Sequence, residues 1–458
     1  MDDNSTPSPR PQKGRSKGAK FLVVCALAVL MAIPALLVFA LLMERTNRAE
    51  GVAREIGDQM GGEQVFLGPV IQIPYVIPTR TSTDEKGNRV VLAQESGNLI
   101  VFPQAGKANA ATKSDVRSRS IFRVPVYTAD LTFDAAFDLK DVQAARPGAV
   151  LMWDKAQLVT GATDSRGARK DIVAQIDNRS VILAPSGPGV TGLSPDGTDF
   201  DLFAAPLALT DKTTPLNIKV AMTFSGTRKL GILAYGKSSE ASITGDWKYP
   251  SFGGGFLPVT RQTDDSAHKG GFNAQLSVPF IARGLPAVID QNQMMTLGKS
   301  ELSVTFVEPT NPYQSVGRSL KYALLFVGLV FLTYFLFEST SKKELHPAQY
   351  ILVGLAQITF YLLLLSFAER IGFDAAFVVA AGATVTLIAG YAGLIFHSRW
   401  RFMAAFAVFS ALYALIYVLM RMEDYALLVG ACSAFLVIAA VMVLTRNINW
   451  YGNRAEGE

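Results

Sequence analysis

A long uncharged segment near the C-terminus constrains the fold of this chain more than any other feature. Residues 345–373 read LHPAQYILVGLAQITFYLLLLSFAERIGF, and no charged side chain occurs between Pro347 and Ala368. About twenty consecutive apolar residues is the length at which an α-helix crosses the hydrocarbon core of a bilayer. We therefore interpret this segment as a transmembrane helix, and the rest of the chain must be placed relative to a membrane.

Further apolar segments have a similar length and composition. They lie at residues 21–43, 319–337, 373–396, 402–420 and 425–444. We predict six spans in all, with one anchor at 21–43 and an integral membrane α-helical bundle of five spans within 319–445. The anchor exceeds the roughly 7–15 apolar residues of a signal peptide, so we expect it to stay uncleaved. Pro34 should bend it.

The segment between the anchor and the bundle, residues 44–318, has the composition of a water-soluble domain. A helix-forming stretch ends at Gly61 and Gly62, and short β-branched and aromatic runs follow, punctuated by Gly, Pro, Asn and Asp. We predict a large, mostly antiparallel β domain of one or two sandwich-like units. Within it, we expect the alanine-rich residues 104–112 to form a loop.

Charge patterning orients these segments. Lys and Arg are concentrated in residues 10–20 and in the short loops that hold Lys342 with Lys343 and Arg399 with Arg401. Such residues favour the cytoplasmic side of a membrane. We predict a disordered cytoplasmic tail at 1–20, a second cytoplasmic tail at 446–458, and a β domain outside the cytoplasmic membrane, in the periplasm where the cell has one.

Composition and motifs also exclude some partners. The net charge of +5 is not gathered on one face with interleaved aromatics, so we predict no nucleic-acid binding. The segment GILAYGKS at 231–238 matches a phosphate-binding loop, but the strand-like SEASITGDWKYP follows it instead of a helix. We therefore predict no nucleotide binding. Cys25 and Cys432 both lie in apolar spans, which leaves the β domain without a disulfide.

Residue types that carry catalysis or hold metals are scarce. His268 is the only histidine in residues 44–318, and it lies in a polar turn beside Asp264 and Asp265. A single histidine excludes a multi-histidine zinc site, and no nucleophile motif accompanies it. We predict a protein that is not an enzyme, with no catalytic residues, cofactor or metal. The expected spans contain few polar residues, among them Gln357, Thr384 and Ser433, and no buried charge.

Three stretches together resemble the CreD family of bacterial inner-membrane proteins, which are described as cell envelope integrity proteins. They are QVFLGPVIQIPY at 64–75, WKYPSFGGGFLPVTR at 247–261 with GGFNAQLSVPFIARGLP after it, and FVEPTNPYQSVGRSLKYALLFVGLVFL at 306–332 followed by the stretch at 345–373. The resemblance implies a multi-pass protein of the bacterial inner membrane that is linked to envelope maintenance. In some bacteria, members of this family are expressed under the control of a two-component sensor and regulator. The family supplies no catalytic residues or cofactors.

Two groups of residues within these stretches are candidate functional clusters. Trp247, Phe252 and Phe256 surround a glycine-rich turn, where they either pack as structure or line an aromatic groove. We favour the structural interpretation. His346, Gln349 and Tyr350 lie within five residues at the expected cytoplasmic face, where Pro347 favours a helix start. They form our best candidate for a polar site.

The leading functional hypothesis is a non-enzymatic membrane protein whose periplasmic domain binds envelope components or inner-membrane protein partners. An alternative is a transporter or flippase that moves a lipid or envelope precursor through the bundle. A sensor is a third hypothesis, although the inner loops are too short to hold a signalling domain. An enzyme acting on envelope polymers through His268, Asp264 and Asp265 comes last.

Overall fold

The computed structural model describes residues 17–78, 81–83, 89–91, 94–177, 179–186, 199–207, 209, 214–264, 271–308, 312–341, 343–421 and 426–446. The chain divides into two compact units. The helical unit comprises Met1–Arg48 and Thr310–Glu458, and the β unit comprises Ala49–Pro309.

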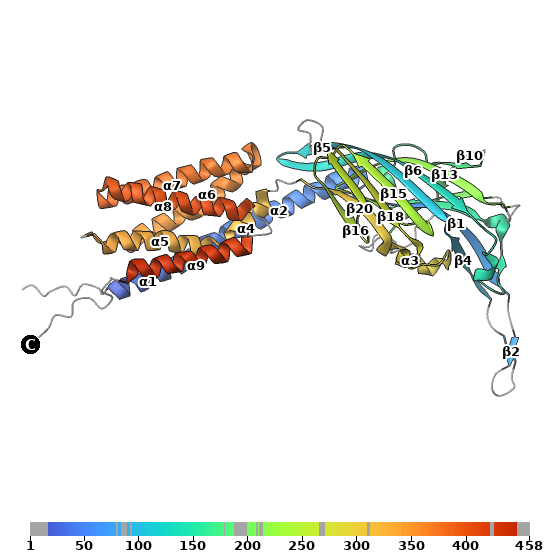
Figure 1. Ribbon diagram of the computed structural model, residues 1–458, viewed down its shortest axis with the longest axis horizontal. Coiled ribbons are helices and arrows are strands. Elements are labelled where there is room, and N and C mark those ends of the chain that lie inside the picture. Colours follow the sequence, from blue (N-terminus) through green and yellow to red (C-terminus); the bar gives the residue numbers. More distant parts are fainter. Residues whose placement is uncertain are drawn as a thin grey trace, which may run out of the picture. The chain divides into compact units, whose positions relative to one another are not determined.

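The helical unit contains long apolar helices that run alongside one another (Figure 1). They are α1 (Lys17–Leu30), the first half of α2 (Ala32–Met60), α5 (Ala323–Ser339), α6 (Pro347–Ile371), α7 (Phe373–Phe396), α8 (Arg399–Arg421) and α9 (Ala426–Thr445), and the short, more polar helix α4 (Pro312–Leu320) precedes α5. Within the described residues, four segments are long and apolar enough to cross a membrane, or five if α4 and α5, bent by 55°, form one span. The count of six spans stays a prediction.

The N-terminal helix packs against the rest of the helical unit. Val24, Met31, Val38 and Leu42 are buried at spacings of seven and four residues, which places them on one face. Helix α1 contacts α5 and α6, and the rings of Phe21 and Phe335 lie 5.3 Å apart. The sequence predicts a bend at Pro34, and the structure has a break in the helix at Met31, between α1 and α2. Proline has no N–H to donate to the carbonyl four residues earlier, so the helix is weakened there.

The β unit is built on two large sheets. Among the described residues, the first has ten strands: β1 (Gln64–Ile77), β4 (Glu95–Val101), β7 (Val150–Leu151), β8 (Gln157–Ala162), β11 (Ala184–Pro185), β12 (Asp201–Pro206), β14 (Lys229–Leu233), β16 (Pro250–Gly254), β19 (Val288–Asp290) and β20 (Glu301–Phe306). The second has eight, in the order β10 (Arg179–Ile182), β9 (Val173–Ile176), β13 (Leu216–Thr227), β6 (Phe122–Phe137), β5 (Ala105–Arg119), β15 (Ser238–Gly245), β18 (Gly271–Val278) and β17 (Thr260–Asp264).

Shorter elements join these sheets. They are the hairpin β2 (Thr81–Thr83) and β3 (Arg89–Val91), the helix α3 (Phe280–Arg283) and the 3₁₀ helices η1 (Gln143–Ala145), η2 (Trp153–Lys155), η3 (Ser165–Gly167) and η4 (Gln291–Ser300). Neighbouring strands pair antiparallel except β1 with β14 and β5 with β15. The prediction of a large, mostly antiparallel β domain is confirmed.

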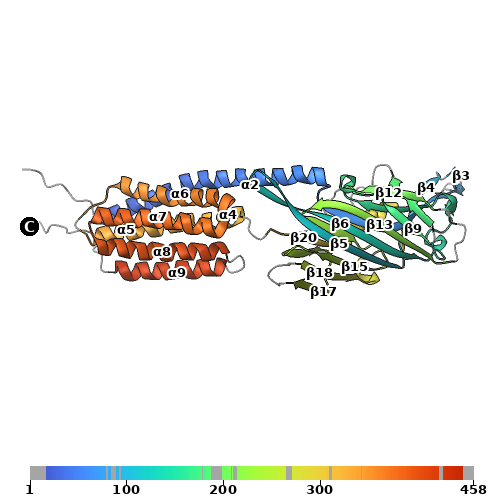
Figure 2. The same cartoon turned by 90° about the horizontal axis from the view of Figure 1, so that it is seen from above.

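One expectation within this domain was wrong. The alanine-rich residues 104–112 lie mostly in β5, which pairs with β6 along its whole length and with β15 on its other side (Figure 2). Its inward positions alternate with exposed ones, and they hold small residues such as Gly106 and Ala108. Small side chains are needed there because a Cβ at Gly106 would lie 2.9 Å from the Tyr235 ring. Close packing therefore outweighs the low strand propensity of Ala and Gly.

Aromatic side chains from both sheets meet in one core. Phe66 of the ten-stranded sheet lies 5.3 Å from Phe224 of the eight-stranded sheet, and Tyr127 stacks on Phe306 at 4.9 Å. Tyr235 is buried against Gly68 on one sheet and Gly106 on the other, and its hydroxyl donates to the Asp134 carbonyl at 2.9 Å. The buried apolar residues of both sheets therefore form a single cluster.

The β unit also fixes the end of α2. The helix stops at Met60, as expected from Gly61 and Gly62, which adopt φ values of +89° and +64°. The Gly62 N–H donates to the Gly57 carbonyl at 2.7 Å, and the Ser225 hydroxyl donates to the Met60 carbonyl at 2.8 Å. These bonds satisfy carbonyl groups that a helix end leaves without partners.

We predict that Gly68→Ala destabilises the β unit by about 1–3 kcal/mol, because the added Cβ has no room. It would lie 2.5 Å from Tyr235 Cδ1, and the ring is held by its own hydrogen bond. Gly253→Ala is the control, since its Cβ would meet nothing closer than Ser303 Oγ at 3.7 Å. The temperature at which a protease begins to cut the β unit of the purified chain measures the difference. Equal temperatures for the two variants would contradict the prediction.

Candidate functional site

The predicted cluster at the start of α6 is divided between two roles. His346 is the N-cap of α6, where its Nδ1 accepts from the Ala348 N–H at 3.3 Å. The Gln349 side chain accepts from the His346 N–H at 2.9 Å, which completes a capping box. Tyr350 is buried and points to a different partner, Glu338. The structure thus places all three near one helix end, with His346 and Gln349 bonded to the backbone of that end.

Glu338 is a buried carboxylate that the sequence interpretation missed. It lies in the last turn of α5 and is 7% exposed. Its Oε1 accepts from the Leu345 N–H at 2.6 Å and pairs with the Lys20 ammonium, while Oε2 accepts from the Tyr350 hydroxyl at 2.8 Å. We call Glu338, Lys20 and Tyr350 the Glu338 node. The node ties α1, α5 and α6 together, and it corrects the expectation that the bundle holds no buried charge.

The basic loops at the same end bond to helix termini. Lys343 Nζ donates to the Ile395 carbonyl at 3.0 Å, and Arg401 Nη2 donates to the Thr340 carbonyl at 3.2 Å. These carbonyls belong to the C-terminal ends of α7 and α5, where the helix dipole favours a cation. The Lys and Arg residues that predicted orientation therefore also stabilise the ends of the helices.

The predicted aromatic cluster is half-buried against the core of the β unit. Trp247 Nε1 donates to the Val307 carbonyl at 2.9 Å, and its ring meets Phe306 edge to face at 6.1 Å. Phe252 makes a similar contact with Phe272 at 5.9 Å, and Phe256 also packs against the core. In the turn between them, Gly254 has φ +94°, and a Cβ on Gly255 would overlap the Lys299 carbonyl. These contacts are those of packed structural side chains.

The other motifs are placed as follows. The phosphate-loop match runs from β14 through buried Tyr235 into strand β15, so no helix N-terminus faces it. Asp265 and His268 lie outside the described residues, and Asp264 is the last residue of β17. Thr384 donates to the Ala380 carbonyl at 2.8 Å within α7.

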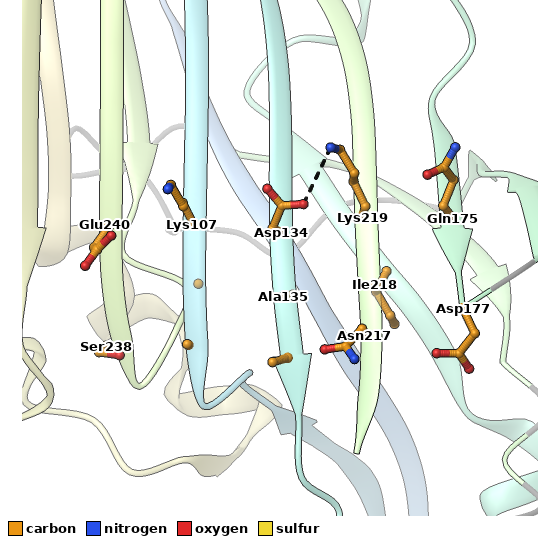
Figure 3. Close-up of a pocket in the computed structure, with 13 residues that line it drawn as sticks. Lys107, Asp134, Ala135, Gln175, Asp177, Asn217, Ile218, Lys219, Ser238 and Glu240 are labelled. Atoms are coloured by element: carbon orange, nitrogen blue, oxygen red, sulfur yellow. Dashed lines mark ion pairs between the residues drawn. The ribbon is translucent and has the colours of Figure 1, made fainter. Parts of the chain in front are cut away.

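A row of charges crosses the open face of the eight-stranded sheet (Figure 3). Glu240, Lys107, Asp134, Lys219 and Gln175 are register neighbours on β15, β5, β6, β13 and β9. The signs alternate along the row, and Lys219 Nζ lies 3.8 Å from Asp134 Oδ1. Opposite charges directly across neighbouring strands stabilise each other by roughly 0.2–1 kcal/mol. Because these side chains are largely exposed, they also remain available to a partner.

A second row beside the charges is made of short side chains. Ser238, Ala105, Ala136 and Asn217 are register neighbours on β15, β5, β6 and β13. Their small size leaves a hollow of about 500 Å³ bordered by the charged row and by Asp177. We call this hollow the sheet groove. The sequence interpretation missed it because residues 104–112 were expected to form a loop.

Comparisons with known proteins agree with this architecture. Residues 16–451 match the family model described as "Inner membrane protein CreD". The chain belongs to the CreD family. It is 28% identical over 425 residues to the inner membrane protein CreD of Escherichia coli (strain K12), covering 92% of this chain and 91% of that protein.

Membership makes this CreD-family protein a multi-pass protein of the inner membrane. The stretches that carried the resemblance occupy three structural positions. The first is β1, the second contains β16 with the turn after it, and the third runs from β20 through α4 and α5 into α6. They supply β1 in the middle of the ten-stranded sheet, β16 at its edge, and helix α6, which holds Tyr350 of the Glu338 node.

We predict that Glu338→Gln lowers the stability of the helical unit by about 2 kcal/mol, since it removes the buried counter-ion of the Lys20 ammonium and leaves only the exposed Glu344 carboxylate at 3.7 Å. The value is below the roughly 3–5 kcal/mol of a fully buried pair because the Lys20 side chain is 24% exposed. Thermal unfolding of the full chain in lipid nanodiscs measures the loss.

Two comparisons isolate the ion pair. Glu344→Gln is the control, because Glu344 is 89% exposed and lies 3.7 Å from the same ammonium. Adding Lys20→Met to Glu338→Gln should cost less than the sum of the two single changes, as expected for groups in contact. Additive losses would show that the pair does not hold α1 to the bundle.

Proposed function

We propose that this protein supports the integrity of the bacterial cell envelope through non-enzymatic binding by its β unit. In this proposal the chain crosses the membrane six times, both termini are cytoplasmic, and a sandwich-like β unit lies in the periplasm. The concentration of Lys and Arg at the end of the bundle that holds the Glu338 node supports this orientation. The ligand class is an envelope component or an inner-membrane protein partner.

The observation that carries the proposal is the sheet groove. A sheet face in water needs only polar side chains, yet this one aligns Glu240, Lys107, Asp134 and Lys219 in alternating sign beside a row of small residues. Alternating charges give little net attraction at long range but a specific pattern at contact. The small residues keep the hollow open to a volume within the range of ligand sites, about 300–1,000 Å³.

The test is complementation of a deletion strain with the full-length double variant Lys107→Glu and Lys219→Glu. The variant places like charges opposite Glu240 and Asp134, which destabilises the sheet, so its expression is adjusted until its abundance equals that of the wild type. At equal abundance we expect survival in detergent to fall, because both cations of the groove are reversed. Lys140→Glu with Lys155→Glu is the matched control, since it changes net charge equally at exposed sites away from the groove. Full complementation by the groove variant would refute the proposal.

A transporter or flippase is the second candidate, and one observation favours it. Gln357 in α6 and Tyr413 in α8 are buried in the bundle, and Gln357 Oε1 and Tyr413 Oη have no hydrogen-bond partner among the described residues. Polar groups at membrane depth are costly, so they often mark a transport path.

The variant Gln357→Leu with Tyr413→Phe separates the two candidates. Replacing unsatisfied buried polar groups with apolar ones of similar shape is neutral or stabilising, so we expect an equally stable bundle and full complementation. Thermal unfolding in nanodiscs checks stability, and detergent survival checks function. A variant that is stable but fails to complement would favour transport over binding by the β unit.

A further inference from the structure

A second hollow lies at the other sheet, where β1 ends. Strand β4 and the short strand β19 form its floor, and the loop holding Arg146 and the start of η4 border it. Its volume is about 560 Å³. We call it the amide cleft, because Asn98, Gln291, Asn292 and Gln293 all line it.

The floor of the amide cleft is rigid. The Tyr75 hydroxyl donates to Asp290 Oδ2 at 2.7 Å, and the Arg146 guanidinium lies over the Tyr75 ring at 5.1 Å. Burial and the bond to Asp290 raise the pKa of Tyr75 to about 12, so the hydroxyl keeps its proton at neutral pH. Gly97 allows this arrangement, because a Cβ there would lie 2.8 Å from the Tyr75 hydroxyl oxygen.

The charged groups that line the amide cleft already have partners within the protein. Arg146 forms an ion pair with Glu95. Asp290 accepts from the Tyr75 hydroxyl and from the Asn292 N–H at 3.2 Å. Among the described residues that line it, the cleft therefore offers no unpaired cationic group to a phosphate or sulfate. Of its apolar lining residues, Leu99 and Ile289 are buried and Val288 is half-buried. Ala145 is exposed but small, so the described lining offers little apolar surface for a lipid tail.

The groups that face solvent are amides held in fixed positions. Asn98 Nδ2 donates to Gln291 Oε1 at 2.7 Å, which leaves Asn98 Oδ1 as an acceptor and Gln291 Nε2 as a donor. Gln293 accepts from the Asp290 N–H at 3.3 Å and retains its own donors. Because these bonds orient the amides before any ligand arrives, less conformational entropy is lost on binding.

We propose that the amide cleft binds a neutral, hydroxyl-rich saccharide. A hydroxyl is both donor and acceptor, so a sugar ring matches a surface that offers amide oxygens and amide N–H groups side by side. Buried Tyr75 and the Arg146–Glu95 pair give this surface a fixed shape, and Asp290 is the one carboxylate in its described lining without a cationic partner. The inference rests on the proposed periplasmic position of the β unit, where envelope glycans are present, but not on the sheet groove.

The test uses the full chain in lipid nanodiscs and titration calorimetry with chitotetraose and maltotetraose. We expect saturable binding of at least one of them, and no binding of a sulfated chondroitin tetrasaccharide. Asn98→Ala and Asn292→Ala should each weaken binding about tenfold, the effect of losing one or two hydrogen bonds. Asn292 is exposed, so its variant remains informative even if Asn98→Ala disturbs β4.

Two controls make the outcomes distinct. Gln175→Ala removes an amide from the sheet groove instead, and it should leave saccharide affinity unchanged. The groove variant Lys107→Glu with Lys219→Glu should also bind saccharide normally, so failure of the functional proposal and failure of this one are separable. Absence of saturable binding to both neutral tetrasaccharides, or equal binding by wild type and both asparagine variants, would overturn the inference.

Discussion

The hydrocarbon core of a bilayer offers a peptide group no hydrogen-bond partner outside its own chain, and the helical unit is arranged around that constraint. Its helices satisfy their own backbone, and charged side chains are displaced to the ends. Glu338 bonds Lys20 and Tyr350 at one end. At the C-terminal end of α6, Tyr313 donates to Glu369 at 3.0 Å, and at the N-terminal end of α7, Tyr417 donates to Asp374 at 3.0 Å. The helices thus pack through their apolar faces, and the polar contacts lie at the helix ends.

The β unit obeys a different constraint, since water can satisfy its outer surfaces and only the space between its sheets must be filled. Tyr235 fills part of that space from a turn, and it requires glycine at positions 68 and 106 because no other residue leaves room for the ring. The stacked and edge-to-face pairs of Phe66, Phe224, Tyr127 and Phe306 fill more of it. Aromatic packing of this kind contributes both buried area and specific geometry. The packing of one sheet on the other is therefore fixed by the shapes of these side chains as well as by the apolar area that they bury.

Features that depend on neighbouring residues in the chain were predictable. The apolar length of α6, the helix stop at Gly61 and Gly62, and the mainly antiparallel β character all follow from local pattern. Features that depend on distant partners were not. Glu338 directly follows the span expected at 319–337, and its burial was not predictable because its partner Lys20 is far away in sequence. Residues 104–112 were expected to form a loop because their sequence does not show the strands they pair with, nor the Tyr235 ring that requires glycine at position 106.

The candidate sites also divide into features set by neighbouring residues and features set by distant ones. His346 and Gln349 were visible as a motif, but their side chains are committed to capping α6, so the motif marks a helix start. Tyr75 and Asp290 are 215 positions apart, and only the pairing of β1, β4 and β19 brings them to one cleft. A polar group that its own fold has satisfied contributes to stability, whereas one that is oriented yet open to solvent can recognise a ligand. By that criterion, the Glu338 node is structural, and the sheet groove and the amide cleft of the β unit are the sites that we propose for recognition.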